Sequence, residues 1–122
     1  MNILLGIGGS PDSRLALEET VNRVALTGDR LTVAILTDAP SETPVSELED
    51  LVSRTMDDHE IDFELVVLEG DPGPTLTAFA EDRHIDRIVI GGGKRSPMGK
   101  IALGDITEFV VLNADTTVTL VR

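Results

Sequence analysis

Glycines and cations fill a segment near the C-terminus that joins an apolar strand to the start of a helix, IVIGGGKRSPMGKIALGDITEF, residues 88–109. Residues 87–104 contain four cations and no acid: Arg87, Lys94, Arg95 and Lys100. The segment also contains glycines that let backbone N–H groups approach an anion closely: Gly91, Gly92, Gly93, Gly99 and Gly104. A helix that begins after them adds the positive end of its dipole. This pattern predicts a phosphate cradle, or equally a loop whose cations are solvated or pair with acids of a neighbouring subunit.

One carboxylate complicates the phosphate hypothesis. Asp105 stands where a phosphate oxygen would sit, and an ionised carboxylate cannot donate a hydrogen bond to it. We expect Asp105 to be the N-cap of the helix and to form a capping box with Glu108. A like charge at about 4 Å costs about 1 kcal/mol in water and about 4 kcal/mol at an effective dielectric constant near 20, which is roughly one to three decades of affinity. Lys94 would offset part of this cost, and a bridging Mg²⁺ would reverse it.

Other phosphate and catalytic motifs do not fit. The P-loop pattern fails because Gly99 and Lys100 are followed by Ile101 instead of a hydroxyl residue. The dinucleotide fingerprint fails because Pro11 replaces its third glycine, although Asp38 could hold a ribose. A phospho-receiver site lacks its acids after the first strand, and no nucleophile–base set can be assembled. We therefore expect no enzymatic activity beyond feeble ATP hydrolysis.

The elements that position the loop follow from hydrophobic periodicity. Continuous apolar runs predict buried strands at 2–7, 30–37, 62–69, 86–92 and 116–122. Amphipathic stripes between them predict four helices, which begin at Ser10–Pro11, Thr43–Pro44, Asp71–Pro72 and near Asp105, and Gly28 ends the first. The alternation predicts one domain, residues 1–122, with a parallel sheet covered by helices on both faces. Residues 92–103 are predicted to lack secondary structure.

Ligands of such sheets bind beyond the carboxyl ends of the strands, where the strand order reverses. Those ends carry Ile7 and Gly8 after the first strand, Leu36 after the second, and the glycine loop after the fourth. Ile106 is expected to face inward from the last helix. These positions, together with the loop, form the candidate anion site.

The amino-acid composition limits the kinds of partner that the protein is expected to bind. The 122 residues carry a formal net charge of −12, which argues against nucleic acid and anionic membranes as partners. The chain has no cysteine and two histidines that we expect at exposed helix ends, so no metal site is predicted. Lysine occurs only at positions 94 and 100, and this acidic, lysine-poor composition favours a salt-rich cytoplasm over an ordinary one. No apolar run reaches membrane-spanning length and no leader segment is evident, so a cytoplasmic location is expected.

Several separated segments resemble the universal stress protein family. They are the opening LLGIGGSPDS, the IVIG loop with its spaced glycines, and the ending NADTTVTLV. The likeness spans the chain, and the KRSPMGK segment is similar to versions from salt-loving archaea. It implies a flavodoxin-like three-layer α/β sandwich with strand order 3-2-1-4-5, and a homodimer formed through the fifth strand, residues 116–122. The edge position of that strand supports pairing, although Arg122 and strand twist would also protect it.

The resemblance also implies what the loop binds. ATP-binding members carry G-x2-G-x9-G-[ST], which places its first and last glycines at Gly91 and Gly104. This chain departs from the pattern at Lys94 and Asp105, and it has Gly8 where members carry a nucleoside-contacting aspartate. Leu36 matches the residue that packs on adenine. The first hypothesis is therefore a homodimeric stress-response module with weak or lost nucleotide binding. The alternative is a sensor that binds ATP or AMP, with Mg²⁺, through residues 91–105.

Overall fold

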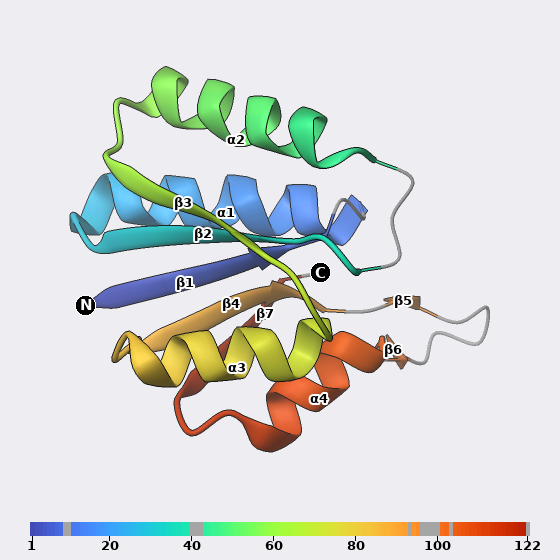
Figure 1. The fold of residues 1–122 in the computed structure, drawn as a ribbon. Coiled ribbons are helices and arrows are strands. Elements are labelled where there is room, and N and C mark those ends of the chain that lie inside the picture. Colours follow the sequence, from blue (N-terminus) through green and yellow to red (C-terminus); the bar gives the residue numbers. More distant parts are fainter. Residues whose placement is uncertain (9–10, 40–42, 93, 96–100, 103, 122) are drawn as a thin grey trace.

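Five parallel strands form a single central sheet (Figure 1). The computed structural model describes residues 1–8, 11–39, 43–92, 94–95, 101–102 and 104–121. The strand order is β3-β2-β1-β4-β7, as the family resemblance implies, with β1 paired in parallel to both β2 and β4. The strands are β1 (Asn2–Ile7), β2 (Arg30–Leu36), β3 (Phe63–Leu68), β4 (Arg87–Gly91) and β7 (Thr117–Val121). Each lies within one residue of its predicted boundaries.

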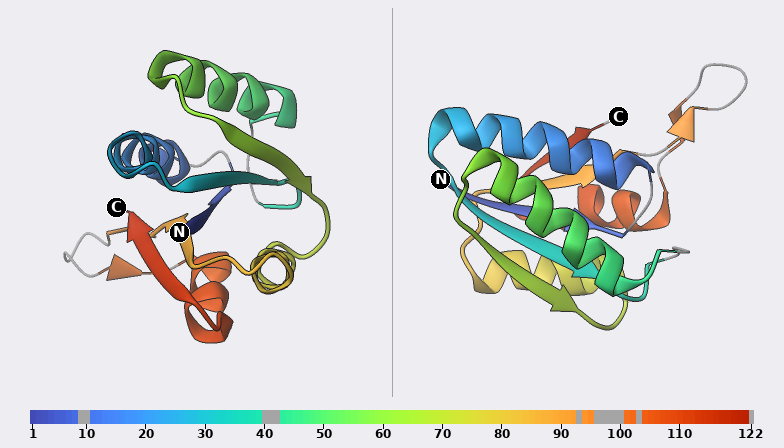
Figure 2. Two further views of the ribbon diagram at one scale, coloured as in Figure 1. Left: turned by 90° about the vertical axis from the view of Figure 1, so that its left-hand side faces the viewer. Right: turned by 90° about the horizontal axis from the view of Figure 1, so that it is seen from above.

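Four helices sandwich the sheet, two on each face (Figures 1 and 2). One face carries α1 (Pro11–Thr27) and α2 (Val45–His59), and the other carries α3 (Pro72–Asp82) and α4 (Asp105–Asn113). Connections between successive parallel strands require such crossovers, which explains why helix and strand alternate along the chain. None of these helices combines the length and apolar character that crossing a bilayer requires, within the residues described.

The sheet separates two hydrophobic cores. Along β1, Ile3, Leu5 and Ile7 pack against α1 and α2, whereas Leu4 packs in the cluster beneath α3 and α4. The alternation of side chains along a strand produces this division, and it explains why a strand covered on both faces reads as a continuous apolar run. The stripe predicted for the second helix is confirmed, since Leu48, Val52 and Met56 are buried.

Helix starts correct two sequence predictions. The N-cap of α2 is Pro44, not Thr43, because the extended Pro44 carries the carbonyl that accepts the N–H groups of Glu47 and Leu48. The N-cap of α4 is Gly104, whose carbonyl accepts the N–H of Glu108 at 2.9 Å. Asp105 is therefore the first residue of the helix, and the side-chain cap expected for it is not formed. The predicted N-cap Ser10 lies outside the described residues.

Other predicted ends are confirmed. Gly28 ends α1 with a left-handed φ of 73°, and its N–H donates to the carbonyl of Val24 at 2.8 Å. His59 ends α2 and His84 follows α3, and both side chains are exposed. The segment 92–103 was predicted to lack secondary structure, and that prediction is wrong. It contains an antiparallel pair, β5 (Lys94–Arg95) and β6 (Ile101–Ala102), because the chain reverses between Gly92 and Gly104.

Candidate functional site

The strand order reverses beside β1, where the chain has built β2 and β3 on one side and then crosses to β4 on the other. A small cavity of about 120 Å³ opens at the carboxyl ends of these strands, on the face that α3 and α4 cover. We call it the crevice. Its described lining is Gly6, Gly8, Ser13, Leu36, Ala39, Ile90, Gly91, Ile106 and Thr107. A hollow therefore lies at the position where sheets of this topology bind ligands.

The end of β1 is closed by its own neighbours. The backbone N–H of Gly8 donates to Ser13 Oγ at 3.1 Å, so this donor is already engaged inside the protein. A Cβ at Gly8 would lie 2.8 Å from the Cβ of Ala39, which leaves little room there for an aspartate. Ile7, a predicted site residue, is not among the described residues that line the crevice. Its side chain is buried in the α1–α2 core because alternation directs it to the opposite face.

At the end of β2, one apolar residue lines the crevice and two polar residues tie β2 to the end of β3. Leu36 is 5% exposed and lines the crevice, as an adenine-packing residue would. Asp38 does not extend toward a ribose, because its Oδ2 accepts the backbone N–H of Gly70 at 3.0 Å. The Thr37 N–H also donates to the carbonyl of Leu68 at 3.1 Å, so both contacts tie the ends of β2 and β3 together.

The end of β4 is packed tightly against the start of α1. A Cβ at Gly91 would lie 2.7 Å from the Cβ and 2.9 Å from the carbonyl carbon of Asp12. Glycine is therefore required at position 91 by the approach of a helix, independently of any anion. The Gly92 N–H donates to the carbonyl of Val121 at 2.8 Å, which extends the pairing with β7 and removes another donor from the predicted cradle.

The first turn of α4 completes the crevice. Ile106 is half-buried and lines it, as predicted. Thr107, which is 6% exposed, donates its hydroxyl to the carbonyl of Gly91 at 2.9 Å. This bond joins the residue where the glycine loop begins to the helix where it ends. Asp105 is exposed in the same turn and contributes its negative charge at the positive end of the helix.

The predicted cation cluster is only partly assembled. Lys94 and Arg95 lie in β5, and their backbones pair with Ala102 and Ile101. Lys100 lies outside the described residues. Arg87 does not belong to the cluster, because it stands at the amino end of β4 and the strand separates it from Gly91 by about 13 Å, at about 3.3 Å per residue.

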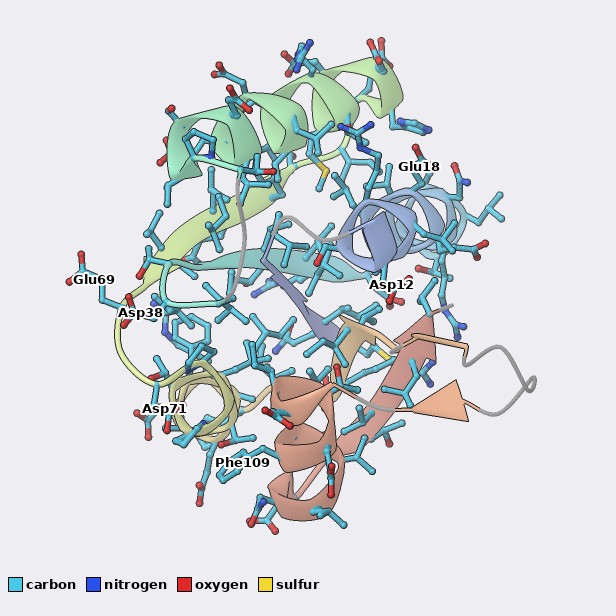
Figure 3. All side chains as sticks on the ribbon, turned by 90° about the vertical axis from the view of Figure 1, so that its right-hand side faces the viewer. Asp12, Glu18, Asp38, Glu69, Asp71 and Phe109 are labelled. Atoms are coloured by element: carbon cyan, nitrogen blue, oxygen red, sulfur yellow. The ribbon has the colours of Figure 1, made fainter. Side chains whose placement is uncertain are left out.

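Figure 3 views the molecule from the carboxyl ends of the strands. Asp12 lies at the start of α1, and Asp38, Glu69 and Asp71 gather where β2 and β3 end and α3 begins. Acidic side chains therefore lie at two places on this edge. Nevertheless, within the described part of the chain, no three acids or histidines come close enough together to hold a metal ion.

Sequence reasoning missed three residues of this site. Ser13 and Thr107 are buried hydroxyls that engage the backbone, and Asp12 packs against Gly91. Small polar residues in the first turn of a helix after a glycine-rich loop are a usable signal. The atoms that these side chains contact, however, depend on how α1 and α4 pack on the sheet and cannot be derived from residue spacing.

Comparison with known proteins agrees with this geometry. The sequence model of the universal stress protein family matches residues 1–122. A universal stress protein of Methanothermobacter thermautotrophicus is 42% identical over 62 residues, which are 51% of this chain and 42% of that protein. The chain therefore matches less than half the length of this curated relative.

Solved structures share the whole fold. A universal stress protein from Archaeoglobus fulgidus superposes with a TM-score of 0.77 at 22% identity, covering 100% of this chain and 98% of that one. A structure from the same organism in complex with dAMP gives a TM-score of 0.70 at 18% identity, with coverages of 100% and 98%. A family protein from Arabidopsis thaliana with AMP bound gives 0.74 at 16% identity, with coverages of 99% and 90%. The sheet order, the crevice at its reversal point and the full-length sequence match together show that this chain belongs to the universal stress protein family.

Proposed function

We propose that this chain is a stress-response module that acts by binding instead of catalysis, and that its adenine-nucleotide site is weak. The observation that carries the proposal is the state of the crevice. Its volume of about 120 Å³ is below the roughly 300–1,000 Å³ of typical ligand pockets. The N–H groups of Gly8 and Gly92, which a phosphate cradle would offer, donate to Ser13 and Val121 instead.

The charges around the crevice also weaken the binding of a phosphate. Asp105 occupies the first position of α4, where an anion would otherwise meet the free N–H groups of the helix. Asp12 lies against Gly91 from the other side. Two carboxylates thus flank the place where a phosphate would bind, and each repels it. Lys94 follows Gly91 closely in the chain and would offset part of this repulsion.

The test is calorimetric titration of AMP and ATP, each with and without Mg²⁺, into the native chain and Asp105→Thr. We expect weak binding by the native chain and at least about tenfold tighter binding by the variant, because a hydroxyl donor replaces a repelling charge. Glu108→Gln is the matched control, because it removes the other exposed carboxylate of the same turn. Micromolar ATP binding by the native chain, or equal effects of the two substitutions, would contradict the proposal.

The second candidate is a nucleotide sensor that works with Mg²⁺. It is favoured by the structures of relatives in complex with dAMP and AMP, whose fold this chain shares. In this case Asp105 and the phosphate would share the ion, and Gly91, Lys94, Arg95 and Gly104 would surround it. Binding that appears only when Mg²⁺ is added, and that Asp105→Thr abolishes, would establish the sensor in place of the weak site.

We also propose that two copies pair through β7. The two edges of the sheet differ, because β3 carries Glu64, which pairs with Arg83 at 3.4 Å, whereas β7 is uncharged from Thr117 to Val121. Charges on an edge strand discourage pairing, so β7 is the edge suited to a second strand. Arg122, included in the predicted interface, lies outside the described residues. Sedimentation of a monomer at all concentrations would refute this assembly.

The acidic composition supports adaptation to a salt-rich cytoplasm. A net charge of −12 on 122 residues produces self-repulsion that salt screens. We therefore expect the melting temperature to rise when KCl is increased from about 0.1 M to about 1 M, which shortens the screening length from about 10 Å to about 3 Å. An unchanged melting temperature would contradict the proposal that the acidic composition is an adaptation to high salt.

A further inference from the structure

A second hollow, larger than the crevice, lies on the opposite face of the sheet. Its volume is about 320 Å³, and it runs between the outer side of α1 and the strands β4 and β7. Figure 2 shows β7 at the edge of the sheet, with α1 as the helix nearest to it on this face. The floor is apolar and consists of Ile3, Val89 and Val121. We call this hollow the α1–β7 groove.

The groove contains an arginine that has no carboxylate partner among the described residues. Arg87 is half-buried in its wall, and one terminal nitrogen donates to Thr119 Oγ1 at 3.4 Å. Its Nε is shielded from solvent and has no hydrogen-bond partner among the described residues. Glu19 lines the groove but forms no ion pair with Arg87. In a chain with 22 acids and ten bases, it is unexpected that a half-buried arginine has no acidic partner in the described part of the chain.

A second polar group in the groove is also unsatisfied. Thr20 is 4% exposed, lines the same hollow from α1, and its hydroxyl has no partner among the described residues. Buried hydroxyls and guanidinium N–H groups are normally paired, so two unpaired groups beside one small hollow mark a place where the described residues leave polar groups unsatisfied. Leu26, at the rim, is 89% exposed and extends the apolar surface outward.

We propose that the α1–β7 groove binds a small apolar carboxylate, of the kind of a medium-chain fatty acid. The carboxylate would pair with the guanidinium of Arg87, which offers planar donors matched to a carboxylate. The aliphatic chain would cover Val89, Val121 and Leu26. Arg23 and Arg87 outnumber Glu19 in the lining, so the groove attracts an anion within a strongly acidic protein.

Size favours a small molecule over a protein side chain. The volume of about 320 Å³ lies at the lower end of the range for ligand pockets, roughly 300–1,000 Å³. A second copy paired through β7 would bring Thr117–Val121, which contains no acid to satisfy Arg87. The groove lies on a face of β7, whereas strand pairing uses its edge, so both can be occupied together. This inference is independent of the nucleotide site.

The experiment is titration of sodium decanoate into the native chain and into Arg87→Gln, followed by calorimetry and by backbone amide shifts at Thr20, Leu26 and Thr119. Arg54→Gln is the matched control, because it removes one positive charge from α2 on the same face of the sheet. We expect Arg87→Gln to weaken decanoate binding by at least about tenfold, and Arg54→Gln to leave it within about twofold. Acetate and 1-decanol, which carry only the head or the tail, should each bind more weakly than decanoate.

Leu26→Ser keeps the proposal testable if Arg87→Gln does not fold, because its exposed position leaves the core intact. It should weaken the binding of decanoate and leave that of acetate unchanged. Equal binding by Arg87→Gln, shifts confined to other faces, or no decanoate binding at millimolar concentration would overturn the proposal. Loss of decanoate binding on dimerisation would overturn it too, since the groove would then belong to the contact between copies.

Discussion

The crevice and the α1–β7 groove differ in how completely the protein satisfies its own polar groups. In the crevice, the hydroxyls of Ser13 and Thr107 each engage a backbone group, and glycine contacts bring the elements together. In the groove, Thr20 and the Nε of Arg87 have no partner among the described residues. The crevice lies where topology predicts a ligand, yet it is the smaller hollow and is flanked by carboxylates.

This difference separates two contributions to a binding site. Strand order and crossover connections determine where a hollow can form, and they are shared across a fold family. The side chains then determine whether the hollow is closed by internal contacts or left open for an occupant. Under the proposed function, this chain keeps the shape of a nucleotide site while its internal hydrogen bonds and charges oppose the nucleotide.

The largest expected effect is a loss of stability at Gly91, where the end of β4 packs tightly against α1. Gly91→Ala places a Cβ 2.7 Å from Asp12 Cβ and 3.0 Å from its carbonyl oxygen, where helix backbone cannot yield. We expect a loss of about 2–3 kcal/mol in the free energy of unfolding, as for overpacked cores. Urea unfolding measures this loss directly. Gly104→Ser is the control, since no atom lies within 4 Å of its Cβ and serine is a good N-cap.

A smaller effect is expected at the hydroxyl of the crevice. Thr107→Val removes the 2.9 Å bond to the carbonyl of Gly91 while nearly preserving the shape of the side chain. We expect a loss of about 1 kcal/mol, the usual net contribution of a buried hydrogen bond. Thr107→Ser keeps the hydroxyl and should recover most of the stability. If valine and serine cost the same, the missing methyl or packing would explain the effect, and the bond would not.

Replacing threonine by valine should have the opposite effect on stability in the α1–β7 groove. Thr20→Val replaces a buried hydroxyl that has no partner, so it removes an unsatisfied group without breaking a bond. We expect the free energy of unfolding to rise by about 0.5–1 kcal/mol, since threonine and valine have similar helix propensities. Chemical unfolding of the two Thr→Val variants in parallel tests the comparison. A loss of stability at Thr20 would show that its hydroxyl is satisfied after all.

The fold could be predicted from sequence because its signals are local and repeated. The apolar run at β1 and the stripe Leu48, Val52 and Met56 each follow from one periodicity, and the pattern of alternation then limits the topology. Errors occurred where short-range rules compete. Both Thr43 and Pro44 suit a helix start, and both Gly104 and Asp105 can cap one, so sequence alone assigned each cap one residue away.

The candidate site was harder to predict from the sequence because its contacts join residues that are far apart in the chain. Glycine at 91 was attributed to an approaching anion, whereas α1 is the element that approaches it. Arg87 was grouped with Lys94 by its position in the chain, although a whole strand separates them in space. Nearness along a strand is not nearness in space, because each residue advances the chain by about 3.3 Å.

The smallest expected effect concerns Asp29, a satisfied carboxylate that lines neither hollow, and it sets the scale for exposed polar contacts. Asp29 accepts the Thr27 hydroxyl at 2.8 Å and pairs with the N-terminal ammonium at 3.0 Å. The Thr27 hydrogen bond, followed by that of the ammonium, lowers the pKa of Asp29 below its ordinary value. The folded protein therefore holds the ionised form more strongly than the unfolded chain does.

The stability that Asp29 contributes is thus fully present above its unfolded pKa of about 4, and it is lost as the pH falls through the lower folded value. Asp29→Asn should melt below the native chain at neutral pH, and the difference should shrink toward zero under acid conditions. Melting curves of both proteins between neutral and acid pH, recorded at constant ionic strength, measure this convergence. A difference that stays constant with pH would assign the effect of Asp29→Asn to packing, because only the ionised carboxylate responds to acid.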